Sequence, residues 1–137
     1  MSTTLHQIAD GVWVAPQVSV MDMTELAAAG FCLLVNHRPD DEEGGQPSAA
    51  DITNAAEAAG LRALHAPVHG LPDPAVVAVT REALKGMEPG DKVLMFCRSG
   101  MRSACAWAMA ERQNGADPDA LRAAALKAGY DLSRVPL

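Results

Sequence analysis

A short run of this chain combines a thiol with two arginines and two hydroxyl side chains. The run is Cys97-Arg98-Ser99-Gly100-Met101-Arg102-Ser103. A thiolate is a strong nucleophile, and a guanidinium offers a planar pair of N–H donors that suits phosphate, sulfate or thiosulfate-like oxyanions. A cysteine that only fills a core has no use for two neighbouring arginines. The pattern therefore predicts a loop that binds an oxyanion and presents the Cys97 thiolate to it.

The residues on either side of this run predict that it is a strand-to-helix turn. An apolar strand over residues 92–96 comes directly before it, and a helix over about 103–113 follows. N–H groups of the turn and of the helix start would point at a common centre and stabilise an anion there. Gly100 permits a backbone conformation that a Cβ would block. The residues expected to line the anion site around Cys97 and Arg102 are Arg98, Ser99, Gly100, Met101 and Ser103.

Alternating strand and helix patterns predict the fold class. The expected strands are 11–15, 31–36, 61–68 and 92–96, and the expected helices are 21–29, 48–60, 73–85, 103–113 and 118–128. This order is typical of an α/β domain with a central, mostly parallel sheet of four to five strands flanked by helices. Active sites of such sheets lie beyond the carboxyl ends of the strands. We therefore expect the loops 37–47, 69–74 and 97–102 to converge.

Length, charge and cysteine count limit the classes of function. The 137 residues fit one domain spanning 1–137, and the net charge of −6 gives no basic surface for nucleic acid. No apolar run approaches the ~20 residues that a bilayer-spanning helix needs, so no membrane partner is expected. Three cysteines argue against a disulfide framework. Without an apolar signal-peptide core, the expected location is the cytoplasm.

The loop around Cys97 resembles the active-site loops of two families of cysteine-dependent enzymes. It is similar to the loop of rhodanese-type sulfurtransferases, in which six residues beginning with the cysteine cradle a persulfide. Protein tyrosine and dual-specificity phosphatases use a loop that is one residue longer. Four residues separate Cys97 from Arg102 here, where those phosphatases have five. They also usually carry His before the cysteine, where this chain has Phe96.

The remainder of the chain resembles phosphatases. Residues 33–40, then a helix, then His65-Ala66-Pro67-Val68 resemble the body of dual-specificity-like phosphatases, and the Gly-His-Ile-x-Gly-Ala segment of rhodaneses is not found. Over about residues 5–132, the core of the domain, the chain resembles the bacterial family of beta-lactamase hydrolase-like phosphatases. The matching motifs include Arg38-Pro39-Asp40 and the closing Ala128-Gly129-Tyr130-Asp131-Leu132. This resemblance implies a dual-specificity phosphatase-like fold.

Three functions stay open, and we favour the phosphatase. In a phosphatase, Cys97 attacks a phosphomonoester and forms a cysteinyl-phosphate, while Arg102 and the loop amides hold the oxygens. The resemblance implies a general acid in the second loop, where Asp73 or His69 lies, and Asp40 in the first loop is a third candidate. Asp73 is also placed to cap a helix. In a sulfurtransferase, which the short loop favours, Cys97 carries a persulfide and needs no acid. The third alternative is a non-catalytic oxyanion-binding module.

Other polar residues have more than one interpretation. Arg38 either lines the mouth of the pocket or pairs with the acidic residues 40–43. Three histidines, His37, His65 and His69, make only a weak metal site, so we expect no metal and no cofactor. The expected partner is a small phosphorylated or sulfane-sulfur substrate. The sequence makes no prediction of the oligomeric state.

Overall fold

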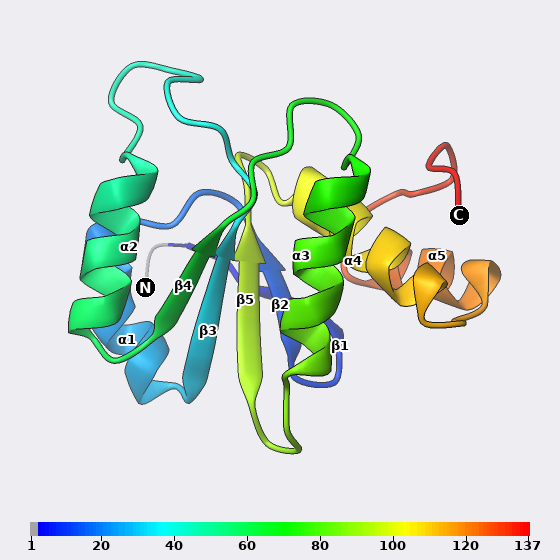
Figure 1. Cartoon of the computed structure of the whole chain (residues 1–137), viewed down its shortest axis with the longest axis horizontal. Helices are drawn as coiled ribbons and strands as arrows, with labels where there is room; N and C mark the ends of the chain where they lie inside the picture. The colour runs from blue at the N-terminus through cyan, green and yellow to red at the C-terminus, as the bar shows by residue number, and fades with distance from the viewer. Residues whose placement is uncertain (1–2) are drawn as a thin grey trace.

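A five-stranded sheet runs through the centre of the molecule in the strand order β1-β2-β5-β3-β4 (Figure 1). The computed structural model describes residues 3–137. β1 (His6–Ala9) pairs antiparallel with β2 (Val12–Ala15). β2, β5 (Lys92–Phe96), β3 (Phe31–Asn36) and β4 (Arg62–His65) pair in parallel. The predicted mostly parallel sheet is confirmed.

Helices cover both faces of this sheet (Figure 1). The elements on one face are a 3-10 turn, η1 (Val20–Asp22), with α1 (Met23–Ala28) and α2 (Ala49–Ala58). Those on the other face are α3 (Pro74–Lys85), α4 (Met101–Gln113) and α5 (Pro118–Lys127). Among residues 3–137, no helix combines the length and the apolar character that crossing a bilayer requires.

Successive residues of the central strands feed two separate cores. Leu34, Leu94 and Phe96 pack with α1 and α2. Their neighbours Val35 and Met95 pack with α4 and α5. This alternation explains why β3 and β5 read as continuous apolar runs, since a parallel strand covered on both faces must be apolar at every position. The carboxyl ends of the two strands therefore emerge side by side between helical layers.

Side chains cap the starts of two helices, and the cap at Asp73 was predicted from the sequence. Ser48 Oγ accepts from Asp51 N at 3.1 Å at the start of α2, and Asp73 Oδ1 accepts from Val76 N at 2.9 Å at the start of α3. α4 begins at Met101, two residues earlier than expected, because Gly100 serves as its N-cap with φ of 99°. The Cys97 loop is correspondingly tighter than the sequence pattern predicted.

The observed strands differ from the predicted ones at two places. β1 was missed, although Asp10-Gly11 is a common hairpin-turn pair and Gly11 has φ of 72°. The strand expected over 61–68 ends at His65, since its ladder partner Asn36 is the last residue of β3. The chain then continues as an irregular segment, held by Val68 N donating to His37 O at 2.8 Å. This segment carries the second loop to the end of the sheet.

Candidate active site

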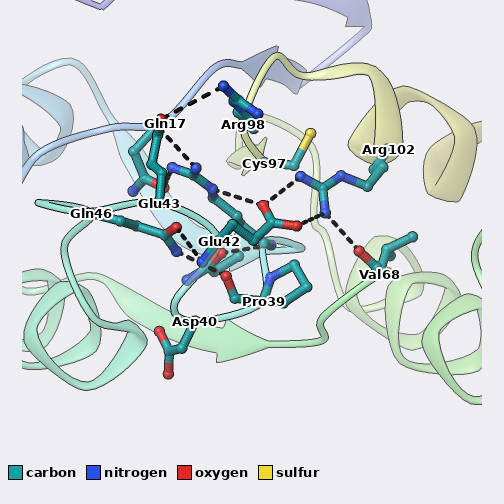
Figure 2. A network of polar contacts seen from close by, with 12 residues as sticks. Gln17, Pro39, Asp40, Glu42, Glu43, Gln46, Val68, Cys97, Arg98 and Arg102 are labelled. Carbon is teal, nitrogen blue, oxygen red and sulfur yellow. Dashed lines mark hydrogen bonds and ion pairs between the residues drawn. The ribbon is translucent and has the colours of Figure 1, made fainter. Parts of the chain in front are cut away.

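The side chain of Arg102 joins the three loops at the carboxyl end of the sheet (Figure 2). Its Nη1 donates to Val68 O at 2.7 Å and to Glu42 Oε2 at 2.8 Å, and its Nη2 donates to Glu42 Oε1 at 2.8 Å. Arg102 is the second residue of α4, directly after the cysteine loop, Glu42 lies in the first loop, and Val68 leads into the second. The predicted convergence of the three loops is confirmed by these contacts.

Cys97 lies next to Arg102 in this cluster (Figure 2). It directly follows β5 and is fully buried, and its Sγ accepts a hydrogen bond from Gly100 N at 3.1 Å. That N–H belongs to the N-cap residue of α4, so the sulfur lies at the positive end of a thirteen-residue helix. The left-handed conformation of Gly100 turns the amide towards the sulfur, which is the role that the sequence predicted for a glycine here.

Glu42 occupies only one end of the Arg102 guanidinium. A guanidinium has five N–H donors, and the Nη1–Nη2 end serves Glu42 and Val68. The Nε–H and the second Nη2–H take no part in these bonds. Figure 2 shows the Cys97 sulfur beside the guanidinium, on the side away from Glu42. Arg102 therefore presents a two-donor edge next to the Cys97 sulfur, a geometry suited to two oxygens of an oxyanion.

The charges around Arg102 fix the ionisation of Glu42. Its hydrogen bond with Arg102, supported by Arg38, lowers the pKa of Glu42 to about 2. The same bond raises the pKa of Arg102, and the negative charge of Cys97 adds to that effect. Glu42 is therefore a carboxylate at neutral pH and has no proton to donate. The sequence did not single out Glu42 as a site residue.

Arg38 anchors the acidic loop. It is 2% exposed; Nε donates to Glu42 Oε1 at 2.9 Å, Nη2 to Glu43 Oε1 at 3.0 Å and Nη1 to Gln17 Oε1 at 3.1 Å. Of the two interpretations left open, the structure shows the ion pairs. Arg98 is 64% exposed and lies 3.6 Å from Glu43 Oε2, so its side chain lies at the rim. Arg38 thus holds Glu42 in position for Arg102.

The three candidate general acids lie in different surroundings. Asp73 caps α3 and lines a hollow with His65 and Pro67, while its Oδ2 takes no part in the cap bond. Asp40 Oδ1 accepts from Ala49 N at 2.7 Å, at the start of α2. His69 is exposed in the second loop. Asp73 and Asp40 thus each accept a hydrogen bond from a backbone N–H at a helix start.

His37, the residue after β3, is a buried histidine that joins α4 to α3. From the sequence it was considered only as part of a weak metal site. His37 Nδ1 lies 2.8 Å from Ser103 Oγ, and His37 Nε2 lies 3.0 Å from Thr80 Oγ1. All three side chains are fully buried. Burial, with the nearby His65 and Arg102, lowers the pKa of His37 to about 3, so the ring is neutral. Ser103, expected to line the anion site, instead bonds this histidine.

Comparison with known proteins identifies the family of this chain. The family model for the beta-lactamase hydrolase-like protein, phosphatase-like domain, matches residues 4–116. The beta-lactamase hydrolase-like protein of Agrobacterium fabrum is 32% identical over 111 residues, which are 80% of this chain and 25% of that protein. This chain therefore spans about a quarter of the length of the curated relative that it matches.

The solved structures share the whole fold. A candidate phosphatase from Neisseria meningitidis has a TM-score of 0.77 and 28% identity, covering 93% of this chain and 90% of that chain. A kinase associated phosphatase, solved with serine in place of its catalytic-site cysteine, has a TM-score of 0.73 at 14% identity, covering 94% of this chain and 84% of that chain. The second likeness shows the fold alone.

The family model and the fold place this chain in the class of phosphatase-like proteins, and the fold is shared with a solved phosphatase that has a catalytic-site cysteine. Within that class, the chain belongs to the family of the beta-lactamase hydrolase-like protein, phosphatase-like domain. The family resemblance and the dual-specificity phosphatase-like fold inferred from sequence are both confirmed.

Proposed function

We propose that this protein hydrolyses a small phosphomonoester through a cysteinyl-phosphate on Cys97. The observation that carries the proposal is the two-donor edge of Arg102 beside the buried sulfur. A phosphoryl group placed there meets the thiolate on one side and charged N–H donors on its oxygens. Those donors act on the charge that develops in the transition state, where such stabilisation contributes most to the rate.

The reaction has two steps. In the first, Cys97 Sγ attacks phosphorus, the P–O ester bond breaks, and the leaving oxygen takes a proton from a general acid. In the second, water attacks the phosphorus and gives a proton back to the same group, the S–P bond breaks, and inorganic phosphate leaves with the thiolate restored. Arg102 and the loop amides other than that of Gly100 hold the phosphoryl oxygens throughout. Arg98, Ser99 and Met101 act through this backbone, while the Gly100 N–H donates to the Cys97 sulfur.

We propose that the general acid comes from the second loop. Asp73 is the first candidate, because its Oδ2 is not used by the helix cap, and His69 is the second. Asp40 is less suited, since it lies at the start of α2 on the far side of the acidic loop, bound to Ala49 N. Glu42 is excluded by its low pKa of about 2.

A sulfurtransferase is the second candidate function. The specific observation in its favour is the spacing of four residues between Cys97 and Arg102, with α4 already beginning at Met101. In that reaction the Cys97 thiolate attacks the sulfane sulfur of a donor such as thiosulfate, the S–S bond of the donor breaks, and sulfite leaves. The resulting persulfide passes its outer sulfur to an acceptor thiol or to cyanide, which restores the Cys97 thiolate. No general acid takes part, so this function does not require a proton from Asp73, His69 or Asp40.

Side-by-side assays separate these functions. Aryl phosphate hydrolysis and thiosulfate-to-cyanide sulfur transfer should be measured for the wild type, Cys97→Ser and Arg102→Lys. We expect aryl phosphate turnover that Cys97→Ser abolishes and that Arg102→Lys lowers by about 100-fold, because lysine keeps the charge but lacks the two-donor edge. Turnover of thiosulfate alone would reject the phosphatase. Oxyanion binding without either activity would support the binding module.

A further inference from the structure

One peptide group of the catalytic loop is held by hydrogen bonds on both of its ends. Gly100 N donates to Cys97 Sγ at 3.1 Å, and the carbonyl oxygen of the same peptide group, Ser99 O, accepts from the Tyr130 hydroxyl at 3.3 Å. In a trans peptide the C=O and the N–H point in opposite directions. The Tyr130 hydroxyl, this peptide group and the Cys97 sulfur therefore form one continuous chain of hydrogen bonds.

Tyr130 fits closely against this peptide group. A Cβ on Gly100 would collide with the Tyr130 hydroxyl, so the missing side chain of Gly100 makes room for the phenol. Tyr130 itself is 8% exposed and packs in the core shared by Leu132 and Val135. Its ring also makes an edge contact with His6 at 5.8 Å. The C-terminal segment is thus anchored beneath the catalytic loop.

We propose that Tyr130 is a positioning residue for the nucleophile, acting through the Ser99–Gly100 peptide group to hold the Gly100 N–H on the Cys97 thiolate. The inference rests on the proposed role of Cys97. It adds a residue from outside the stretch that the family model matches, residues 4–116. Tyr130 does not touch the substrate.

Two physical effects carry this role. Donation to Ser99 O polarises the peptide group, which makes its N–H a stronger donor to the sulfur. Donation also restricts rotation of a peptide group that lies next to a left-handed glycine. Burial, and then the charge of Cys97, raise the pKa of Tyr130, so the phenol keeps its proton and stays a donor at neutral pH.

The test is the pH profile of Cys97 alkylation by iodoacetamide, followed by mass spectrometry of the Cys97 peptide. Tyr130→Phe removes the hydroxyl and keeps the ring. We expect the midpoint of the profile to rise by about 0.3–1 pH unit, because one indirect hydrogen bond to the thiolate is weakened. The alkylation rate below the midpoint should fall about two- to tenfold.

A matched control separates positioning from simple anchoring of the C-terminal segment. Val135→Ala loosens the same segment without touching the hydroxyl. It should lower the melting temperature and leave the alkylation midpoint unchanged. A midpoint in Tyr130→Phe equal to that of the wild type would overturn the inference, as would an equal shift in Val135→Ala. An ordinary thiol midpoint in the wild type itself would instead count against the proposed nucleophile.

Discussion

One end of the Arg102 guanidinium is hydrogen-bonded within the protein, and another edge of it faces Cys97. Glu42 and the Val68 carbonyl hold the Nη1–Nη2 end, and the remaining donors lie beside Cys97. A flexible arginine would lose rotamer freedom each time it bound an oxyanion. Because Glu42, held by Arg38, already fixes the Arg102 side chain, most of this conformational entropy is lost on folding and not on binding. Glu42 is therefore a part of the site that never needs to touch the substrate.

Glu42→Gln tests this arrangement. The amide cannot accept from both Arg102 nitrogens, so Arg102 loses its fixed orientation. We expect kcat on an aryl phosphate to fall by about tenfold. Glu43→Gln is the matched control, because Glu43 binds Arg38 and Arg98 but makes no bond to Arg102. Steady-state kinetics of both variants decide the point: equal activity of Glu42→Gln and wild type would contradict the account.

At the level of elements, the strand β5 and the helix α4 determine the position of Cys97, the proposed nucleophile. These two elements could be predicted from the sequence, because an apolar run, a cysteine, a glycine and a helical pattern follow one another in the chain. The contacts of Arg102 with Glu42 and of Tyr130 with Ser99 could not be predicted. They join residues 60 and 31 positions apart, and only the folded sheet brings them together. The same limit concealed the pairing of His37 with Ser103.

The loop between β4 and α3 carries the prediction for the general acid. Asp73→Asn keeps a side chain that caps α3 but removes the proton donor. If Asp73 is the acid, kcat should fall about 100-fold on an alkyl phosphate and much less on an aryl phosphate with a good leaving group. His69→Gln should then leave both rates near those of the wild type. The opposite pattern would assign the acid to His69.

The link from β3 to α3 and α4 predicts a pH-dependent stability. His37 has a pKa of about 3 in the folded protein against 6.5 as the reference value. Between these values the unfolded chain binds a proton that the folded protein does not, so stability is complete above pH 6.5 and is lost as the pH falls. The loss at pH ~5 should be about 2 kcal/mol.

Urea unfolding at pH ~7.5 and ~5 measures this loss. His37→Asn removes the titrating ring and keeps an amide near Ser103, so its stability should change less over the same interval. Glu42 adds a loss only below pH 4.5, where its carboxylate becomes protonated in the unfolded chain, so it does not interfere. Identical pH dependence in the two proteins would show that the pKa of His37 is not lowered.

At the scale of the whole molecule, the C-terminal segment packs against the Cys97 loop and against the first strand. The sheet and the Cys97 loop come from residues covered by the family model, 4–116, and the fold class was predictable from their order of strands and helices. The segment after α5 returns to pack Tyr130 beneath the loop, near His6 of β1. The Tyr130 contact does not follow from local pattern, because it depends on the closure of the whole domain, whereas β1 had a local signal in the Asp10-Gly11 turn pair.

The central claim is that Cys97 accepts a phosphoryl group. Rapid quenching of the wild type with an aryl phosphate, followed by mass spectrometry of the Cys97 peptide, tests it most directly. The account predicts a phosphoryl adduct on Cys97 that forms at least as fast as turnover and is absent from Cys97→Ser. One extra sulfur atom on Cys97 after thiosulfate treatment, with no phosphoryl adduct under any condition, would contradict it.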